Sequence, residues 1–450
     1  MRMREAMTCM VLLAATSSLC ADEWKCDVIY LKNGHSFDGL VTAETKDSVH
    51  FKCISRRPGS RSSVFATVFP QEEIARIDRI NDQDRQELAR RIEQLEGRED
   101  KEKSRMAALP LEKAPWPNNG TAWQYSGKYF RLVSNAREDL VRRVCVRLDD
   151  IFQAYTDNLG APRQPAQPTQ IVLYRSQADY DSYLTSVRLN IRNPAFYDPR
   201  ANQIVAASDL ERVAAELQEF RQKHEALLVE LDQYEKRLKK HFNNQPPANL
   251  VKKLQDDRRA VQIANSENES AFERASRPLF TTLYHEAFHA YLDTFVYPSN
   301  EMTVPRWLNE GLAQIYETAL VETGELRVGH VDPKRLAAVQ EAIRKNKFVS
   351  LAELLRSEPR HFQVAHRSDA FQSDRYFQAS WALAYYLTFD RKLLSNEGLD
   401  KYVQELRRGA DPLEAFRDLV GEPLADFENH FHKYMLNLRP DGSLKSAPQP

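Results

Sequence analysis

Two histidines four residues apart are the first feature of this sequence that could do chemistry. They stand in the segment His285-Glu286-Ala287-Phe288-His289, and a helix would place both imidazoles on one face. Two imidazoles at this separation can bind one zinc ion. Glu286 lies one step round the helix, so it could act as a general base on water without binding the metal itself.

A catalytic zinc site needs a third protein ligand as well as an open position for water. The segment Trp307–Ala313 supplies Glu310, with twenty residues between it and His289. This length suffices to end one helix, turn, and return on a second helix that starts near Pro305. We therefore predict that His285, His289 and Glu310 bind zinc. A purely structural zinc site is disfavoured, because such sites are usually closed by Cys ligands.

These motifs resemble those of a known enzyme family. The run HEAFH followed by WLNEGLAQIYE is similar to the gluzincin metallopeptidases, which include the aminopeptidase N group. It is particularly similar to bacterial peptidase-MA-like proteins, many of them uncharacterised. The similarity extends from about Trp123 to Leu436 and includes Phe196–Pro199 and Tyr376–Leu383. The resemblance implies an α+β metallopeptidase domain, with a small mixed sheet and a helical subdomain.

The function that this resemblance implies is zinc-dependent hydrolysis of peptide bonds, with a peptide or protein as substrate. His285, His289 and Glu310 would bind the zinc ion, and Glu286 would take a proton from water and pass it to the leaving amine. The alternative is a catalytically inactive, zinc-containing envelope scaffold, which binds partners through other parts of the chain. An intact Glu286 beside intact ligands favours the enzyme.

Gluzincins also use a Tyr or His downstream of the Glu ligand to stabilise the oxyanion. Tyr376 is our candidate for this role, with His366 and then His361 as further candidates. Tyr376 could equally be an ordinary core or surface tyrosine. Glu317 resembles a position that is acidic in related peptidases, and it could support a ligand histidine.

One departure from the family concerns the substrate. The Gly-x-Met-Glu-Asn strand that aminopeptidases use near the substrate amine is absent from this sequence. We therefore favour an endopeptidase over an aminopeptidase. Gln203–Ala207 reads either as the edge strand along which an extended peptide would lie or as an interior strand of the sheet.

Charge excludes one class of partner. The 63 Lys and Arg residues are balanced by 64 Asp and Glu residues, so the formal net charge is −1. A protein that binds nucleic acid through bulk positive charge would not show this balance. We expect no nucleic-acid partner.

The first 21 residues read as a signal peptide. Arg2 and Arg4 are followed by an apolar or small stretch from Ala6 to Leu19, and Ala21 is a plausible cleavage point. The stretch is short for a transmembrane helix. We expect an exported protein, periplasmic or secreted, although an uncleaved N-terminal anchor is the alternative.

Composition divides the rest of the chain. Residues 22–80 carry several short strand patterns and predict a small SH3-like or Sm-like β-barrel. Residues 81–117 are a charged linker or helix, and residues 118–438 form the predicted peptidase domain. The tail 439–450 is expected to be disordered.

Residues 209–272 predict a helical hairpin or short coiled coil, inserted before the zinc helix. Apolar residues at helical spacing among dense charges precede a break at Pro246-Pro247 and a second charged helix. Ser276 would then cap the separate zinc helix. The hairpin and the barrel at 22–80 are the candidate surfaces for a protein partner, although a solvated hairpin packed on its own seam is the simpler interpretation.

Three cysteines remain after the signal segment. Cys26 and Cys53 lie in the same small β-domain, so an oxidising compartment permits a disulfide between them, and three unpaired thiols are the alternative. Cys145 falls on the apolar face of a helical pattern and is expected to be a small core residue.

Overall fold

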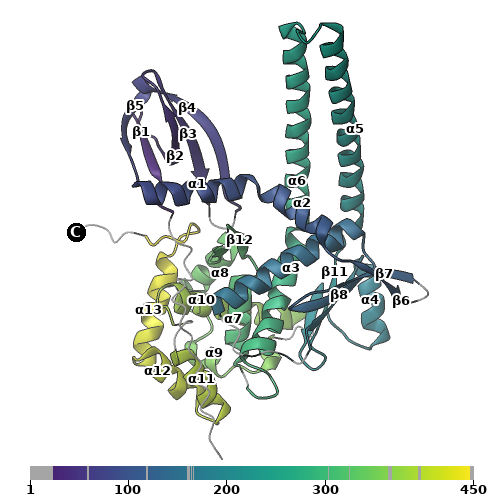
Figure 1. The fold of residues 1–450 in the computed structure, drawn as a ribbon. Coiled ribbons are helices and arrows are strands. Elements are labelled where there is room, and N and C mark those ends of the chain that lie inside the picture. The colour runs from purple at the N-terminus through teal and green to yellow at the C-terminus, as the bar shows by residue number, and fades with distance from the viewer. Residues whose placement is uncertain are drawn as a thin grey trace, which may run out of the picture.

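The computed structural model describes residues 24–445, apart from 58–59, 118–119, 160–162, 164, 166, 303, 324, 363–366 and 394–396. The predicted signal peptide, residues 1–21, and His366 therefore lie outside the described residues. Helices and strands are mixed along the chain, with helix the larger share (Figure 1). Within the described ranges, no helix is both long and apolar enough to cross a membrane.

The N-terminal part is a five-stranded antiparallel sheet. Alternating apolar residues give each strand a buried face, and Gly34 supplies the positive φ of 87° that the first turn requires. The strands follow the order β4-β3-β2-β1-β5 across the sheet. They are β1 (Asp27–Leu31), β2 (Ser36–Glu44), β3 (Ser48–Ser55), β4 (Ser63–Pro70) and β5 (Ile74–Asp78).

Both faces of this sheet bury apolar side chains, and the two cysteines lie on different faces. Cys53 packs in one cluster with Ile29 and Phe51, while Cys26 packs in the other with Leu40. Both cysteines are free thiols. The disulfide that their shared domain permits is therefore not formed, because the sheet separates them.

The segment predicted as a charged linker contains two helices and a strand. Asn81 caps α1 (Asp82–Glu96), which covers one face of the N-terminal sheet, and α2 (Arg98–Ala108) continues to the larger part of the chain. The strand β6 (Glu112–Trp116) then pairs with the larger sheet. That sheet therefore begins before residue 118, where the sequence had placed the boundary.

The larger sheet has six strands in the order β10-β11-β9-β8-β7-β6. Pairing is parallel between β8 and β9 and between β9 and β11, and antiparallel elsewhere. The remaining strands and neighbouring helices are β7 (Gly120–Ser126), β8 (Phe130–Ser134), α3 (Glu138–Leu159), β9 (Thr169–Tyr174), α4 (Gln177–Ser186), β10 (Ala195–Asp198) and β11 (Gln203–Ala207).

This order decides between the two interpretations of Gln203–Ala207. The strand β11 lies between β10 and β9, so it is interior, as its four buried apolar residues require. The edge is formed by β10 instead. The Tyr197 hydroxyl of β10 donates to Oδ2 of Asp293 over 2.7 Å, which ties the edge strand to the turn just after the helix that carries His285 and His289.

A long helical hairpin stands away from the rest of the molecule (Figure 1). Its helices are α5 (Glu211–His241) and α6 (Ala248–Tyr291). The predicted start of a new helix at Ser276 is wrong, because α6 runs without interruption from the hairpin through Pro278 to the histidines. Pro278 is solvent-exposed, so water can satisfy the carbonyl that loses its helical hydrogen bond.

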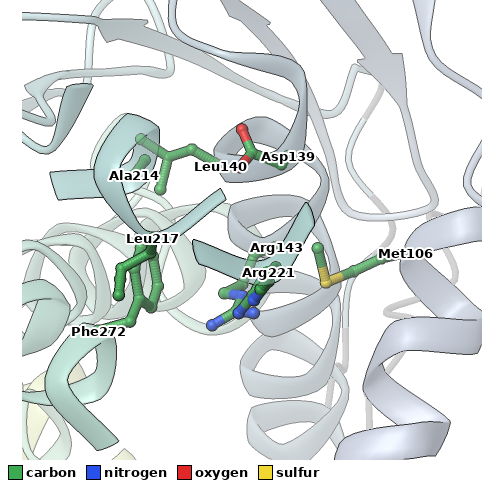
Figure 2. A pocket seen from close by; sticks show the side chains of 8 residues that line it. All are labelled: Met106, Asp139, Leu140, Arg143, Ala214, Leu217, Arg221 and Phe272. Atoms are coloured by element: carbon green, nitrogen blue, oxygen red, sulfur yellow. The ribbon is translucent and has the colours of Figure 1, made fainter. Parts of the chain in front are cut away.

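Ion pairs fix the base of the hairpin to the larger domain. Arg143 of α3 and Arg221 of α5 both pair with Glu269 of α6. The two arginines lie next to each other, with Leu217 and Phe272 nearby (Figure 2). Paired and largely buried charges of this kind hold two elements in one orientation. The hairpin is therefore anchored at its base as an extension of the helix that carries His285 and His289.

The C-terminal half is helical. Its elements are a π-helical turn (Leu292–Val296), α7 (Arg306–Tyr316), β12 (Leu320–Glu322), β13 (Glu325–Arg327), α8 (Pro333–Arg344), α9 (Leu351–Leu355), a 3-10 turn (Pro359–Phe362), α10 (Arg367–Phe389), α11 (Glu397–Arg407), α12 (Pro412–Val420) and α13 (Leu424–Asn437). One large apolar cluster joins these helices to the six-stranded sheet. Part of the tail expected to be disordered is ordered, because Leu438 and Leu444 form a β-bridge.

Polar contacts attach the N-terminal sheet to the short hairpin β12–β13. Glu325 accepts hydrogen bonds from Trp24, Arg56 and Arg91. Glu322 accepts hydrogen bonds from the backbone and hydroxyl of Ser62. The two parts of the chain are thus held together by carboxylates of one β-hairpin.

Candidate metal centre

The three predicted ligands come together where α6 packs against α7. His285 and His289 lie one turn apart near the end of α6, with ring centroids 4.7 Å apart. Glu310 lies in the second turn of α7. One ligand atom from each of the three side chains lies within 4.8 Å of the others. These residues could therefore hold one metal ion.

The distances fit a single ion of the size of zinc. Oε2 of Glu310 lies 3.3 Å from Nε2 of His285 and 3.7 Å from Nε2 of His289. Ligands bound at about 2.0–2.1 Å in a tetrahedron are separated by roughly 3.3 Å. Two imidazole nitrogens and one carboxylate oxygen are also a donor set that suits zinc.

Each histidine is oriented by a second contact on its other ring nitrogen. Nδ1 of His285 donates to Oε2 of Glu317 over 2.9 Å, and Nδ1 of His289 donates to Oδ1 of Asn309 over 2.8 Å. These bonds leave both Nε2 atoms free to face Glu310, as ligands of one ion must. The contact predicted for Glu317 with a ligand histidine is thus present.

Charges around the centre favour a cation. Burial lowers the pKa of His285, but its hydrogen bonds to Glu310 and Glu317 outweigh burial and raise this pKa to about 10. Burial opposes ionisation of Glu310, yet His289, His285 and Arg306 hold its pKa well below its usual range. Glu310 and Glu317 thus favour positive charge at the histidines, and a metal cation bound to neutral imidazoles would supply that charge.

The position of Glu310 depends on the glycine that follows it. A Cβ atom on Gly311 would lie 2.4 Å from the carbonyl oxygen of Ser380 and 2.7 Å from Cβ of Ala384. Only glycine lets α7 approach α10 this closely. The NEG sequence therefore combines a candidate ligand with the packing contact that positions its helix.

The candidate ligands line an open cleft of about 510 Å³, a volume typical of ligand sites. Glu286 lines the same cleft and is only 8% exposed. Edge strand β10 forms another wall, with Asn193–Tyr197 along the cleft, and Phe377 of α10 lies on the lining as well. The general base expected from the sequence therefore shares a cavity with the three ligand residues.

Tyr376 does not line this cleft, contrary to our expectation of an oxyanion donor. Its hydroxyl donates to Oε1 of Glu353 over 2.6 Å, and its ring stacks on His361 at 4.8 Å. Phe362 and Phe377 occupy the neighbouring part of the cleft wall. The physical reason is the rotation of α10, which turns residue 377 rather than residue 376 towards the centre. Burial and the bond to Glu353 raise the pKa of Tyr376 to about 12.

Three residues at the centre were not predicted. Asn309 holds His289, and its place in the WLNEG run directly before Glu310 was a usable signal. Arg306 pairs with Oε1 of Glu310 over 2.6 Å and lines the cleft; four-residue spacing on one helix could have revealed it. Arg335 of α8 donates to Oε1 of Glu317 over 3.0 Å, and no local pattern in the sequence marks it.

A family model covers the part of the chain that contains this centre. Residues 279–408 match a family model described as a protein of unknown function, DUF1570. The matched range contains all three candidate ligands, Glu286 and the close contact at Gly311. It omits the N-terminal sheet and most of the hairpin. No protein of curated function matches the chain.

Proposed function

We propose that this protein is a zinc-dependent peptidase of the gluzincin type. One observation carries the proposal: His285, His289 and Glu310 gather their ligand atoms beside a cleft that Glu286 also lines. Three protein ligands at an open cleft favour a catalytic site, because a structural zinc site is normally closed by a fourth protein ligand.

The residues of the chain divide the chemistry between them. Bound zinc would supply a Lewis acid that polarises a water molecule and the scissile carbonyl. Glu286 would act as the general base, accepting a proton from the attacking water and passing it to the leaving amine. Glu317 and Asn309 keep the two histidines in the orientation that presents Nε2. Arg306 helps to keep Glu310 ionised.

Edge strand β10 supports a peptide as the substrate. Its residues line the cleft on one side, and only β11 pairs with it among the described strands. An extended peptide could add to this edge through main-chain hydrogen bonds, with its scissile bond next to the metal ligands. Such a mode of binding needs no free terminus, so we propose an endopeptidase.

The finer features of the fold belong to the same proposal. A mixed sheet with an antiparallel edge strand, followed by a helix carrying both histidines, supports the gluzincin assignment. The order β4-β3-β2-β1-β5, with the last strand beside the first, is compatible with an SH3-like or Sm-like barrel. We also propose that residues 1–21 direct export.

The experiment that tests this function measures metal and cleavage together. The mature chain is purified, its zinc content is determined, and a mixed peptide library is digested and read by mass spectrometry. We expect about one zinc per chain and cleavage within peptides. Glu286→Gln should keep the zinc and lose about 10²–10⁴-fold in rate, since it removes the general base.

Each other outcome has a definite meaning. Retained cleavage in Glu286→Gln would refute the role of Glu286. Glu310→Ala should lose zinc, and unchanged zinc content would refute its role as a ligand. Zinc bound at full occupancy with no cleavage of any peptide would favour the alternative, an inactive envelope scaffold.

A further inference from the structure

The hairpin carries two apolar stripes although it has only one internal seam. Leu217 and Leu238 of α5, with Leu254 and Val261 of α6, are buried where the two helices meet. A second stripe borders this seam on the solvent-exposed side of α5, and we call it the outer stripe. Its large apolar side chains stay exposed although the hairpin has formed, so the contact with α6 does not account for them.

The outer stripe consists of Phe220, Leu227 and Tyr234. These residues are spaced by seven, so they lie two turns apart on the same face of the helix. Their exposed fractions are 49%, 42% and 43%, which is high for large apolar side chains. Across the described residues no other segment covers them, and the hairpin stands away from the body of the molecule (Figure 1).

A row of charges with alternating sign runs beside this stripe. The row consists of Glu216, Lys223, Glu230 and Arg237, also spaced by seven. The ammonium of Lys223 lies 5.7 Å from the ring centroid of Phe220, and the guanidinium of Arg237 lies 5.9 Å from that of Tyr234. The two basic residues therefore flank the aromatic rings, on the edge of the same face.

This face is complementary to itself when two copies run antiparallel. With a two-fold axis at Leu227, each Leu227 faces its own counterpart and each Phe220 faces Tyr234 of the second copy. The charge rows then lie along the same edge and match to within one residue: Glu216 lies opposite Arg237, and Lys223 opposite Glu230. Both pairs follow from one alignment, as an interface with two-fold symmetry requires.

A parallel two-fold alignment would place the two charge rows on opposite edges of the interface, so Glu216 could not meet Arg237 and Lys223 could not meet Glu230. Of the two alignments, only the antiparallel one therefore uses the complementary charges. The present ion pairs of Glu216 with Arg212 and of Lys223 with Glu219 are exposed pairs within one helix. Such pairs contribute little stability, so they can be exchanged for intermolecular pairs at small cost.

We propose that the outer face of α5 joins two copies of this protein, hairpin to hairpin, in an antiparallel two-fold dimer. The helix has 31 residues and is therefore about 46 Å long, which allows overlap along its whole length. The charge row is complementary to a second copy of itself in the opposite direction, which favours a second copy over an unrelated helical partner. The proposal does not depend on the peptidase activity.

Sedimentation velocity of the mature chain across a concentration series tests the proposal. We expect a reversible equilibrium between monomer and dimer. Leu227→Glu places two carboxylates on the axis and should weaken association at least tenfold. Val229→Glu is the matched control, because Val229 is 55% exposed on a different face of the same helix. It should leave the dimer unchanged, and circular dichroism should show equal helix content for both variants.

Charge reversal separates this interface from a general effect on the hairpin. Arg237→Glu should weaken the dimer, because it opposes Glu216 with another carboxylate. The double variant Glu216→Arg, Arg237→Glu restores opposite signs and should restore the dimer. Leu227→Cys should form a covalent dimer on mild oxidation, whereas Val229→Cys should not.

Three results would overturn the proposal. The first is a chain that stays monomeric at every concentration. This result would count against the dimer even if the chain bound a different protein. The second is a dimer that Leu227→Glu leaves intact. The third is a double charge reversal that dissociates the dimer further than Arg237→Glu alone.

Discussion

Oε2 of Glu317 lies 2.9 Å from Nδ1 of His285, although the two residues come from different helices. Glu317 follows the last residue of α7, seven residues after Glu310. One helix therefore provides both a candidate ligand and the carboxylate that orients another ligand. Burial raises the pKa of Glu317, but His285 and Arg335 outweigh burial and hold it below its usual range, so Glu317 is ionised at neutral pH.

This contact predicts that Glu317 controls metal affinity without binding the metal. Glu317→Ala should weaken zinc binding by about 10–100-fold, as is typical when the partner of a ligand histidine is removed. Zinc affinity is measured by competition with a chelator. Glu358→Ala removes an exposed carboxylate away from the cleft and serves as the control. Equal affinity in Glu317→Ala and the wild-type chain would show that the contact is not functional.

Gly311 is predicted to be irreplaceable at its position. Gly311→Ala drives a methyl group into Ser380 and Ala384, so it should destabilise the fold by about 1–3 kcal/mol, the usual cost of overpacking. Thermal unfolding measures the loss. At Gly97 an added Cβ would come no closer than 3.3 Å to another atom, so alanine there should cost much less. Similar costs at both sites would contradict the close approach of α7 and α10.

Tyr376 is predicted to be dispensable for catalysis. Tyr376→Phe removes the bond to Glu353 and should cost about 1 kcal/mol of stability. Because the ring lies outside the cleft, kcat/KM for a cleaved peptide should stay within about twofold of wild type, which corresponds to about 0.4 kcal/mol. A fall of about a hundredfold with zinc still bound would return Tyr376 to the oxyanion role.

Cys26 and Cys53 are predicted to be unreactive thiols in the folded chain. Burial raises the pKa of each to about 11, with Asp38 adding to the effect at Cys26. At pH 8 roughly one thiol in a thousand is then ionised, and only the thiolate reacts with an alkylating reagent. Labelling followed by mass spectrometry should be slow in the native protein and fast after unfolding without reductant. If the unfolded chain labels only after reduction, a disulfide joins the two.

Local periodicity made much of the centre predictable. His285 and His289 share a face because they are four residues apart on a helix, and Glu286 follows from the same geometry. The spacing between His289 and Glu310 is long enough for a turn and a second helix that runs back to the two histidines. The close contact of Gly311 could not be read in this way, because Ser380 and Ala384 lie about 70 residues further along the chain.

The role of Tyr376 shows where the sequence stops being informative. Adjacent residues on a helix point about 100° apart, so only the rotation of α10 decides whether Tyr376 or Phe377 faces the cleft. That rotation is set by packing against α7 and α9. Likewise, Ser276 suggested the start of a new helix, but α6 continues through Ser276 and Pro278 because its exposed side can be hydrated and its buried side is packed.

The sequence by itself determined which residues could bind a metal, because helical spacing and side-chain chemistry are local properties. Only the tertiary structure decided that β10 is the edge strand, that Arg335 supports Glu317, and that Cys26 and Cys53 lie on different faces of one sheet. These relationships depend on contacts between distant segments, and distant contacts leave no periodic pattern in a single sequence.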